Sequence, residues 1–408
     1  MVLTSDACSF LFGARHWLVQ FVGFAPIPIV GVGMTRTEKL LSELIALPSV
    51  NPAFLPGGDP FSGEQKVAEF LAATAAQAGL TVEFQRVSPG RSNLLARLAP
   101  AGKLRSRVLL APHLDTVVAD KRQFVPRITK GRMYGRGACD TKGSVAAMFI
   151  ALCELARGKR RPRKTEIVFA GLVDEENGQA GARALVAGGL RGDLAIVGEP
   201  TRLRVVTAHK GSLWLRLETR GKSAHAARPE LGSNAVYAMA KIVDLFQGEY
   251  AEKLRQRQHP LLGSPTVNVG TISGGTQVNI VPDYCRVLVD RRTLPGETEA
   301  GVIREVRTLL RNKHLKATLA TDQPAPCLPL ETKPGLPLVA QFLSCVGQIR
   351  PAGADYFCDA SVLAQGGIPS VVFGPGDIAQ AHTADEWISL DSLERGKNLL
   401  LDFFRSLP

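Results

Sequence analysis

The sequence predicts an α/β fold: a layered domain around a mostly parallel central sheet, with a smaller α+β domain inserted into it. Two observations support this prediction. Helical periods alternate with short apolar, β-rich runs along most of the chain, and this rhythm changes between residues 211 and 320. Alternation of helices and strands favours a parallel sheet with helices on its faces. The length of 408 residues, with 45% hydrophobic and 21% charged residues, suits two globular domains of ordinary size.

The layered domain is expected in two parts, residues 34–210 and 321–408, because the alternating pattern resumes after Pro324. Helices are predicted where apolar residues recur with the helical period, and strands where short apolar runs are rich in β-branched residues. In chain order the predicted elements are a helix at Glu64–Ala78 that Gly79 ends, a strand at Val108–Ala111, a helix after Lys142, strands at Ile167–Val173 and Leu194–Val197, a helix near Leu336–Val346 and an apolar run at Pro369–Phe373.

Residues 211–320 are predicted to form the inserted α+β domain. Their elements follow the order strand, helix, strand, strand, helix. Alternating apolar residues at Leu213–Leu217 and Val287–Val289 bracket a predicted helix at Ser233–Leu245. Strict alternation is typical of strands that bury one face only.

Residues 1–33 fit neither domain. The apolar run Trp17–Gly33 is interrupted by Gln20 and two prolines, lacks a basic region and a clean cleavage site, and is too short and broken to span a membrane. Just after Met34, Thr35 and Glu38 form a capping-box pattern that opens an amphipathic helix. We therefore expect translation to start at Met34, and residues 1–33 to be a non-native or weakly ordered extension.

Charge and cysteine content restrict the partners and the compartment. The 49 Lys and Arg against 37 Asp and Glu give a net charge of +12, but no stripe of aromatic and basic residues accompanies it. The densest basic run, Arg157–Lys164, lies between an apolar helix and a strand, where a solvated connection is usual. We expect neither nucleic acid nor a membrane as partner. Seven scattered cysteines without a CxxC pair favour reduced thiols in the cytoplasm.

Histidine and acidic residues follow the predicted strands at their carboxyl ends. His113 and Asp115 follow Val108–Ala111, and their spacing directs both side chains to the same side of extended backbone. Asp174-Glu175-Glu176 closes the next strand, and Glu199 closes the one after. The crevice beyond these ends is the usual ligand site of an open α/β sheet. Carboxylates gathered there would repel one another unless a cation neutralised them.

Two loops add further candidates, each with a plain structural alternative. Asp140 lies in the glycine-rich turn Gly135–Gly143 before an apolar helix, where it could cap the helix or bridge two cations. His382 follows a Gly-Pro-Gly turn and by itself is a loop histidine. His113 beside Asp115 is, taken alone, a surface histidine next to a capping aspartate.

Taken together, these residues supply mixed nitrogen and oxygen ligands that suit zinc, manganese or cobalt in a two-metal hydrolase. The predicted ligands are His113, Asp140, Glu176, Glu199 and His382. Glu175 is left over, and a free carboxylate beside a metal-bound water can act as general base. The sequence therefore predicts hydrolysis of a carbonyl derivative in preference to metal storage.

From Thr35 to the C-terminus, these motifs resemble the family of metal-dependent aminoacylases and peptidases that includes acetylornithine deacetylase, succinyl-diaminopimelate desuccinylase and glutamate carboxypeptidase. The resemblance implies that Asp140 bridges two metals, that His113 and Glu199 hold one, and that Glu176 and His382 hold the other. Asp115 would orient His113, and Glu175 would be the base and later the proton donor. The resemblance also implies a cis peptide bond between Asp140 and Thr141.

The resemblance gives the inserted domain the role of a dimerisation or lid domain in a homodimer. His225 matches a histidine that reaches into the active site, in some members from the partner subunit, and would donate to the developing oxyanion; a loop histidine on a dimer surface is the alternative. Asn279 and Arg292 resemble residues that grip the substrate's α-carboxylate. For Arg292 an ion pair with Asp290 or Asp283 competes with this role. Gly374 is assigned to the substrate site.

The resemblance also suggests the substrate. The segments Gly198–Gly211 and Gly374–Glu386 are most similar to acetylornithine deacetylase, although Asp359 stands where that enzyme usually carries Glu. We expect deacetylation of N-acetyl-L-ornithine, within arginine biosynthesis. The alternatives are a succinyl-diaminopimelate desuccinylase, a general N-acyl-amino-acid hydrolase, a carboxypeptidase or dipeptidase, or a catalytically silent metal- or amino-acid-binding relative. For His209 and Lys210 a hinge or packing position is favoured over a chemical role.

Overall fold

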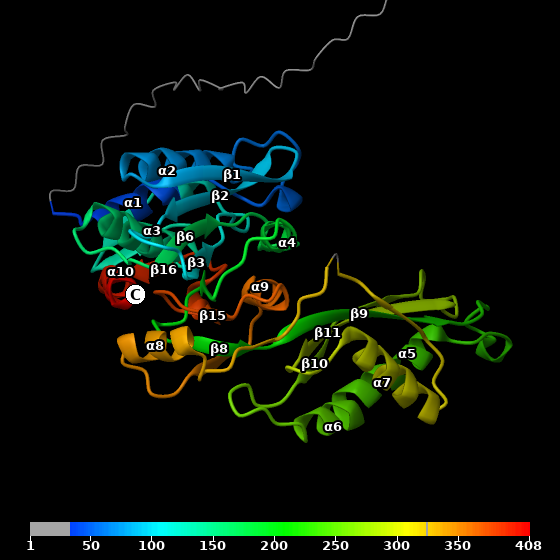
Figure 1. Ribbon diagram of the computed structural model, residues 1–408. Helices are drawn as coiled ribbons and strands as arrows, with labels where there is room; N and C mark the ends of the chain where they lie inside the picture. The colour runs from blue at the N-terminus through cyan, green and yellow to red at the C-terminus, as the bar shows by residue number, and fades with distance from the viewer. Residues whose placement is uncertain (1–32, 324) are drawn as a thin grey trace, which may run out of the picture. The chain divides into compact units, whose positions relative to one another are not determined.

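A mixed central sheet organises the chain outside residues 211–321 in the computed structural model, which describes residues 33–323 and 325–408 (Figure 1). The strand order is β1-β2-β6-β3-β7-β15-β8-β13, with β14 beside β8. The central strands β6, β3, β7 and β15 run parallel, which confirms the predicted fold class, while antiparallel strands flank them on both sides. The strands are β1 Thr81–Ser88, β2 Arg91–Leu98, β3 Ser106–Pro112, β6 Thr165–Gly171, β7 Leu194–Gly198, β8 Val206–His209, β13 Leu330–Glu331, β14 Ala352–Ala354 and β15 Ser370–Val372.

Helices cover both faces of this sheet. α1, α3 and α10 pack on one face, and α4 and α9 pack together on the other. α3 is the helix predicted after Lys142; 14 of its 16 residues are buried, because it lies between the sheet and its two neighbours. The helices are α1 Arg36–Ala46, α2 Gln65–Gln77, α3 Lys142–Arg157, α4 Ala180–Ala187, α8 Pro337–Cys345, α9 Ala360–Gln365 and α10 Leu390–Ser406.

The capping box predicted after Met34 opens α1. The Thr35 hydroxyl accepts the Glu38 N–H at 3.2 Å, and the Glu38 carboxylate accepts the Thr35 N–H at 3.0 Å. Leu40, Leu41 and Leu44 are buried on one side of the helix. The predicted helix start is therefore confirmed. The predicted N-terminal extension falls on residues 1–33, of which 1–32 lie outside the described residues.

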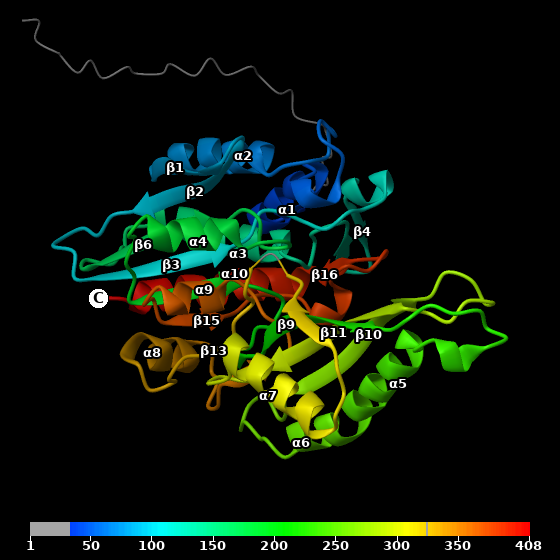
Figure 2. The same cartoon turned by 90° about the vertical axis from the view of Figure 1, so that its right-hand side faces the viewer.

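Residues 211–321 build a second sheet, antiparallel throughout, in the order β10-β11-β9-β12. α5, α6 and α7 cover one face of it (Figure 2). Leu213, Leu215 and Leu217 point into the core beneath these helices while Trp214 is exposed, as the alternating pattern predicts. The elements are β9 Gly211–Arg220, β10 Thr266–Gly274, β11 Tyr284–Thr293, β12 Thr318–Thr321, α5 Ala235–Leu245, α6 Ala251–Arg255 and α7 Glu299–Asn312.

The chain enters and leaves the second sheet at one place. Only Lys210 separates β8 of the central sheet from β9 of the second one. The returning chain passes alongside, since the Ser212 N–H donates to the Cys327 carbonyl at 2.8 Å. His209 is buried here, its Nδ1 donates to the Lys210 carbonyl at 2.8 Å, and burial lowers its pKa to about 4. These contacts agree with a packing position for His209.

A third, small sheet joins the C-terminal segment to the glycine-rich turn before α3. Its order is β16-β5-β4, formed by Trp387–Ser389, Arg132–Tyr134 and Arg127–Thr129. This pairing brings the loop before β16 against the loop after β5, although the two are far apart in sequence. The loops that carry His382 and Asp140 are thereby held side by side.

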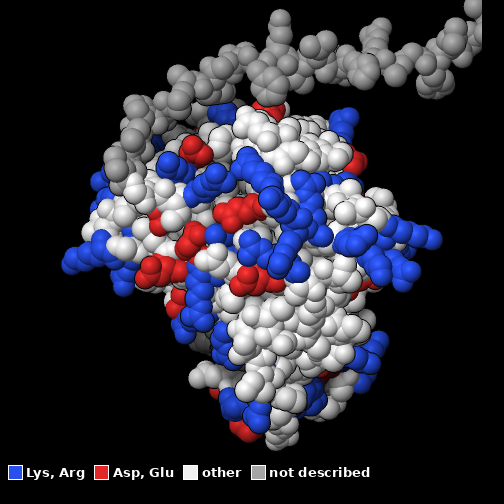
Figure 3. Space-filling view, turned by 60° about the vertical axis from the view of Figure 1, so that its left-hand side comes forward, with Lys and Arg blue, Asp and Glu red and all other residues white. Residues whose placement is uncertain are grey.

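The surface shows how the excess positive charge is distributed. On the face drawn in Figure 3, Lys and Arg side chains are interleaved with Asp and Glu, and a broad area carries no charge. The net charge of +12 is thus not gathered into a uniformly basic surface on this face. None of the helices in the described part of the chain has the length and apolar character required to cross a bilayer.

Candidate metal centre

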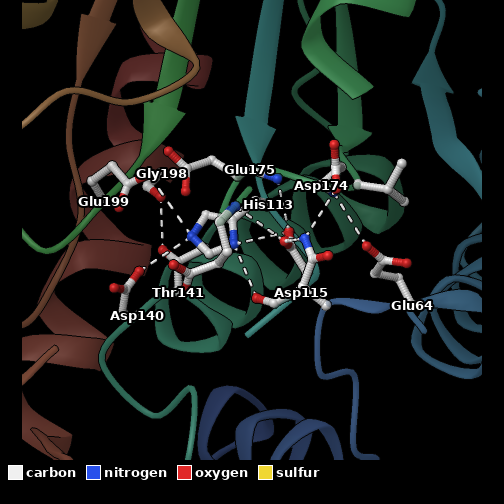
Figure 4. A network of polar contacts seen from close by, with 12 residues as sticks. Glu64, His113, Asp115, Asp140, Thr141, Asp174, Glu175, Gly198 and Glu199 are labelled. Carbon is white, nitrogen blue, oxygen red and sulfur yellow. Dashed lines mark hydrogen bonds and ion pairs between the residues drawn. The ribbon is translucent and has the colours of Figure 1, made fainter. Parts of the chain in front are cut away.

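Side chains from several loops converge beyond the carboxyl ends of β3, β6 and β7 (Figure 4). His113 follows β3, Glu175 and Glu176 follow β6, and Glu199 follows β7. Asp140 arrives from the turn before α3. The structure therefore assembles these residues at the crevice where an open α/β sheet usually binds its ligand.

Two groups of potential ligand atoms share Asp140. His113, Asp140 and Glu199 form one group, and Asp140, Glu176 and His382 form the other; within each group the atoms lie within 4.8 Å of one another. His113 Nε2 is 3.2 Å from Asp140 Oδ1, and His382 Nε2 is 3.3 Å from Asp140 Oδ2. Each oxygen of Asp140 thus faces a different imidazole, as a bridging carboxylate requires. Two imidazoles with three carboxylates are a donor set suited to zinc or manganese.

Buried oxygens without partners test whether this donor set fits cations. Glu176 Oε1 and Glu199 Oε1 are buried and have no hydrogen-bond partner in the described part of the chain. Burial, and after it the charge of Asp140, raises the pKa of Glu199 well above its ordinary value and also raises that of Glu176. Buried carboxylate oxygens without hydrogen-bond partners are costly unless a cation neutralises them. The residues present therefore fit two divalent ions.

The structural alternatives for His113 and Asp140 are wrong. His113 is only 2% exposed, so it is no surface histidine. Asp140 does not cap α3, because the residue before that helix is Thr141. The peptide bond between Asp140 and Thr141 is cis, as predicted.

Asp115 contacts His113 and also the turn that carries the two glutamates. His113 Nδ1 donates to the Asp115 backbone carbonyl at 3.0 Å, with the carboxylate at 3.4 Å, which leaves Nε2 facing Asp140. The Asp115 carboxylate accepts the backbone N–H groups of Glu175 and Glu176, each at 3.1 Å. Asn51 also donates to it at 2.7 Å. Asp115 therefore orients one candidate ligand and fixes the Glu175–Glu176 backbone.

The network around Asp174 supports the same turn from the other side (Figure 4). Asp174 adopts a positive φ of 70°, and its carboxylate accepts Arg91 at 2.8 Å and Asn51 at 3.1 Å. Arg91 is in turn paired with Glu64, whose carboxylate accepts the Asp174 N–H at 3.2 Å. A left-handed conformation is unusual for a non-glycine residue, so these contacts explain how the turn is held.

The Glu175 carboxylate is the acid left over from both groups. It makes no hydrogen bond or ion pair within residues 33–323 and 325–408, in contrast to the neighbouring Asp174. Burial, followed by the charges of Glu199 and Asp359, raises its pKa well above the ordinary value even though His113 lowers it. A partly buried carboxylate with a raised pKa and free oxygens is suited to accept a proton.

Glu386 is a residue of the site for which the sequence predicted no role. It is buried and accepts the backbone N–H groups of Gly137, Cys139 and Asp140 at 3.0, 2.8 and 2.9 Å. Arg136 donates to it at 2.8 Å. Because Glu386 lies four residues after His382, it ties the two loops that bring His382 and Asp140 together. An acid at that spacing from a candidate ligand was the only sequence feature that could have indicated it.

Two residues in loops that follow strands of the second sheet belong to neither metal-ligand group of the described residues. His225 and Asn279 are exposed, and the backbone links their loops, since the Ala226 N–H donates to the Asn279 carbonyl at 3.0 Å. His225 Nδ1 accepts the Ala227 N–H at 3.1 Å and contacts none of the candidate ligands by a hydrogen bond or ion pair in the described ranges.

Arg292 and Gly374 lie closer to the central sheet. Arg292 is paired with Asp290 at 3.0 Å, the competing contact foreseen from the sequence, and its guanidinium lies 5.8 Å from the Phe357 ring centre. Gly374 packs directly against the backbone of Glu199: a Cβ there would come within 2.6 Å of the Glu199 carbonyl oxygen. Its N–H donates to Thr201 Oγ1 at 3.1 Å. In this structure Gly374 positions the backbone beside a candidate ligand.

Known proteins resemble this chain along most of its length. Residues 109–406 match peptidase family M20/M25/M40. An acetylornithine deacetylase of Myxococcus xanthus is 31% identical over 378 residues, covering 88% of this chain and 94% of the relative. The crystal structure of aminopeptidase PepT from Bacillus cereus covers 91% of this chain and 97% of its own at 22% identity, with a TM-score of 0.72. A dinuclear metal-binding peptidase of the M20 family from Bacillus subtilis covers 91% and 97% at 13% identity, with a TM-score of 0.66.

Proposed function

Because the chain belongs to peptidase family M20/M25/M40 and is a metal-dependent amidohydrolase, we propose that it removes the acyl group from a small N-acyl amino acid, with N-acetyl-L-ornithine as the leading substrate. The relative from Myxococcus xanthus is an acetylornithine deacetylase that aligns with most of this chain, which supports this choice of substrate. Arginine biosynthesis in the cytoplasm is the setting that this reaction would have.

One observation carries the proposal: Asp140 presents one oxygen to each of two groups of potential ligands. We assign one ion to His113, Asp140 and Glu199, and the other to Asp140, Glu176 and His382. When bound, two such ions would polarise the scissile carbonyl and lower the pKa of a water molecule. Zinc suits the donor set best, with cobalt or manganese as substitutes.

Side chains of the protein would transfer the proton and position the base and one candidate ligand. Glu175, whose carboxylate has no hydrogen-bond or ion-pair partner among the described residues, would take a proton from the attacking water and return it to the leaving nitrogen. Asp115 would keep the backbone of Glu175 in place through its 3.1 Å hydrogen bond. The same carboxylate orients His113, so the base and one candidate ligand share a support.

The second sheet would supply the substrate contacts in this proposal. Residues 211–320 are assigned as a dimerisation or lid domain, which brings His225 to the developing oxyanion when it closes or when a second subunit is present. Asn279 and Arg292 would bind the substrate's α-carboxylate. For Arg292 this requires exchange of its ion pair with Asp290, which stands at the partly exposed end of β11. Such an exchange is feasible because ion pairs within reach of solvent are weaker than buried ones.

The proposal is tested by hydrolysis assays with purified chain loaded with zinc or cobalt. N-acetyl-L-ornithine is compared with N-succinyl-LL-diaminopimelate, N-acetyl-methionine and a simple dipeptide, with a chelated sample as control. We expect turnover that the chelator abolishes, with N-acetyl-L-ornithine giving the highest kcat/KM. Preference for another compound would keep the chemistry and replace the substrate. Absence of turnover on every N-acyl amino acid and dipeptide would overturn the proposal in favour of a silent relative.

A further inference from the structure

Asp359 is a buried carboxylate that the proposed chemistry does not use. It is 1% exposed, and neither Oδ1 nor Oδ2 has a hydrogen-bond partner in the described part of the chain. It precedes α9, where an aspartate usually caps the helix, but its side chain makes no capping hydrogen bond. A buried polar group without a partner is costly and calls for a specific explanation.

The segment that carries Asp359 runs beside the candidate metal centre. The charge of Asp359 raises the pKa of both Glu175 and Glu199, which requires it to lie near them. The Tyr356 hydroxyl, three residues earlier, lies near Glu199 and Asp140. Burial raises the pKa of Tyr356, and the charges of these two acids raise it further. Between the two, the Phe357 ring lies 5.8 Å from the Arg292 guanidinium. Residues 356–359 thus carry two side chains near the metal centre and one beside a proposed carboxylate-binding residue.

Asp359 is not one of the candidate metal ligands, because it belongs to neither group that shares Asp140. Its surroundings contain four acids, Asp115, Asp174, Glu175 and Glu199, against the two bases His113 and Arg183. Burial, together with the charges of Asp115 and Asp174, raises its pKa to about 7 although His113 and Arg183 act in the opposite direction. The nearby Arg183 guanidinium donates instead to the carbonyls of Gly178 and Pro326, at 3.2 and 2.9 Å. A mobile cation from outside the chain would therefore be stabilised beside Asp359.

A second buried side chain whose polar atoms lack partners among the described residues lies directly before the neighbouring helix α4. Gln179 precedes α4, is 2% exposed, and neither its amide oxygen nor its amide nitrogen has a partner in the described ranges. α4 packs against α9, which begins directly after Asp359, and the Val186 side chain of α4 lies against Gly366 at the end of α9. The charge of Arg183 on α4 acts on Asp359, so the starts of the two helices lie near each other. Together they offer three acceptor oxygens, and a primary ammonium group has three N–H donors.

We infer that Asp359 is a specificity-determining residue that binds the side-chain ammonium group of a basic N-acyl amino acid, assisted by the Gln179 amide oxygen. The inference rests on the proposed function and deepens it by naming the class of substrate. The orphaned oxygens of Glu176 and Glu199 in the same site are assigned to cations on the same grounds. A carboxylate that is fully desolvated distinguishes strongly between a charged and a neutral partner, because no water molecules solvate its charge.

The first experiment compares N-acetyl-L-ornithine with N-acetyl-L-norvaline, which has the same carbon chain without the amine. In the metal-loaded wild-type chain, kcat/KM should be about 100-fold higher for the charged substrate, as expected for a buried charge pair. Asp359→Asn should remove most of this preference by lowering kcat/KM for N-acetyl-L-ornithine, while N-acetyl-L-norvaline changes by less than about threefold. Asp359→Glu should retain part of the preference. Asp402→Asn, which removes an exposed acid on α10, is the control for loss of charge.

A second measurement does not depend on a variant that folds. Competitive inhibition of the wild-type chain by L-ornithine should be stronger than inhibition by L-norvaline, by a factor similar to the substrate preference. The other source of an ammonium group is a free amino terminus, which a dipeptide carries and its N-acetylated form lacks. Comparing these two compounds distinguishes the α-ammonium group from the side-chain ammonium group. If Asp359→Asn weakens only the free dipeptide, the α-ammonium is the partner and the side-chain assignment is overturned.

The remaining outcomes also decide the inference. An equal fall in kcat/KM on charged and neutral substrates would assign Asp359 to the architecture of the site and overturn a specificity role. A wild-type chain that hydrolyses neutral N-acyl amino acids as well as basic ones would overturn the inference while the proposed amidohydrolase stands. A chain that hydrolyses none of them contradicts the proposed function itself, and the two failures are therefore distinguishable.

Discussion

The two sheets differ in how far they complete their share of the proposed site. The central sheet holds His113, Asp140 and Glu199 buried and within 4.8 Å of one another, with backbone contacts that fix each loop. Beside the second sheet, His225 and Asn279 are exposed, and a backbone hydrogen bond joins the two loops that carry them. A single chain therefore suffices to build the ligand cluster, whereas the proposed oxyanion contact needs a movement or a second subunit.

Glu175→Gln should lower kcat by about 10⁴-fold and leave the metal content nearly unchanged, because the base is removed while both ligand groups stay intact. Its matched partner is Asp140→Asn, which should impair binding of both metals, since Asp140 belongs to both groups. Turnover measured beside metal content by atomic absorption separates the two effects. A Glu175→Gln chain that kept most of its activity would show that the base is another group.

His225→Ala should lower kcat by about 10²- to 10³-fold without loss of metal, because the proposed oxyanion donor that it removes makes no hydrogen bond or ion pair with a candidate ligand in the described part of the chain. Mixing this variant with Glu175→Gln tells in which subunit His225 acts. If the chain is a dimer and His225 acts across it, mixed dimers contain one site with both groups, and activity returns. Absence of recovery, with mixed dimers shown by mass spectrometry, would assign His225 to the site of its own subunit.

Glu386→Gln should weaken metal binding by about 10- to 100-fold, the usual effect of losing a group that positions a ligand loop. The carboxylate accepts three backbone N–H groups around Asp140, and the amide can replace only part of these contacts. Isothermal titration with zinc measures the affinity, and a melting curve without metal checks the fold. Unchanged affinity in a folded variant would leave Glu386 with a role in packing only.

The affinity for metal should rise with pH, by about tenfold per unit for each proton displaced. The hydrogen bonds from His382 to Asp140 and Glu176 raise the pKa of His382 to about 10 in the chain without metal. Below that value a proton occupies the imidazole and competes with the ion, so affinity is lost as the pH falls. Titrations between pH 6 and 8 in two buffers of different ionisation enthalpy count the protons released. An affinity independent of pH would contradict this account.

Much of the fold could be predicted because its elements carry strong local patterns. α3 is apolar on nearly every side, since it is buried on all of them, and β9 alternates because only one of its faces is covered. β1 and the strands of the third sheet were not predicted, because they carry no strong local pattern. β1 is largely exposed at the edge of its sheet, and the strands of the third sheet are only three residues long. Such strands are determined by their partners, which a local pattern cannot show.

The candidate ligands were predictable because the chemistry of a metal centre restricts the residue types, and strand ends place them. The contacts that support them were not. Asp115 was expected to act on His113, but its hydrogen bonds to the backbone of Glu175 and Glu176 depend on the approach of two strands. Glu386 was missed because its partners are backbone N–H groups, which are present in every sequence. Whether a side chain has found a partner, as for Asp359, is visible only in three dimensions.

The single crossing point between the sheets has a consequence for how such a chain can be rebuilt. The path out through Lys210 and the path back past Cys327 run side by side, joined by the Ser212 hydrogen bond of 2.8 Å. A segment whose two ends adjoin can be shortened to a brief turn or exchanged for another without displacing the strands that it leaves. The region between them is therefore a module for grafting, through which substrate preference could be altered while the ligand cluster is kept.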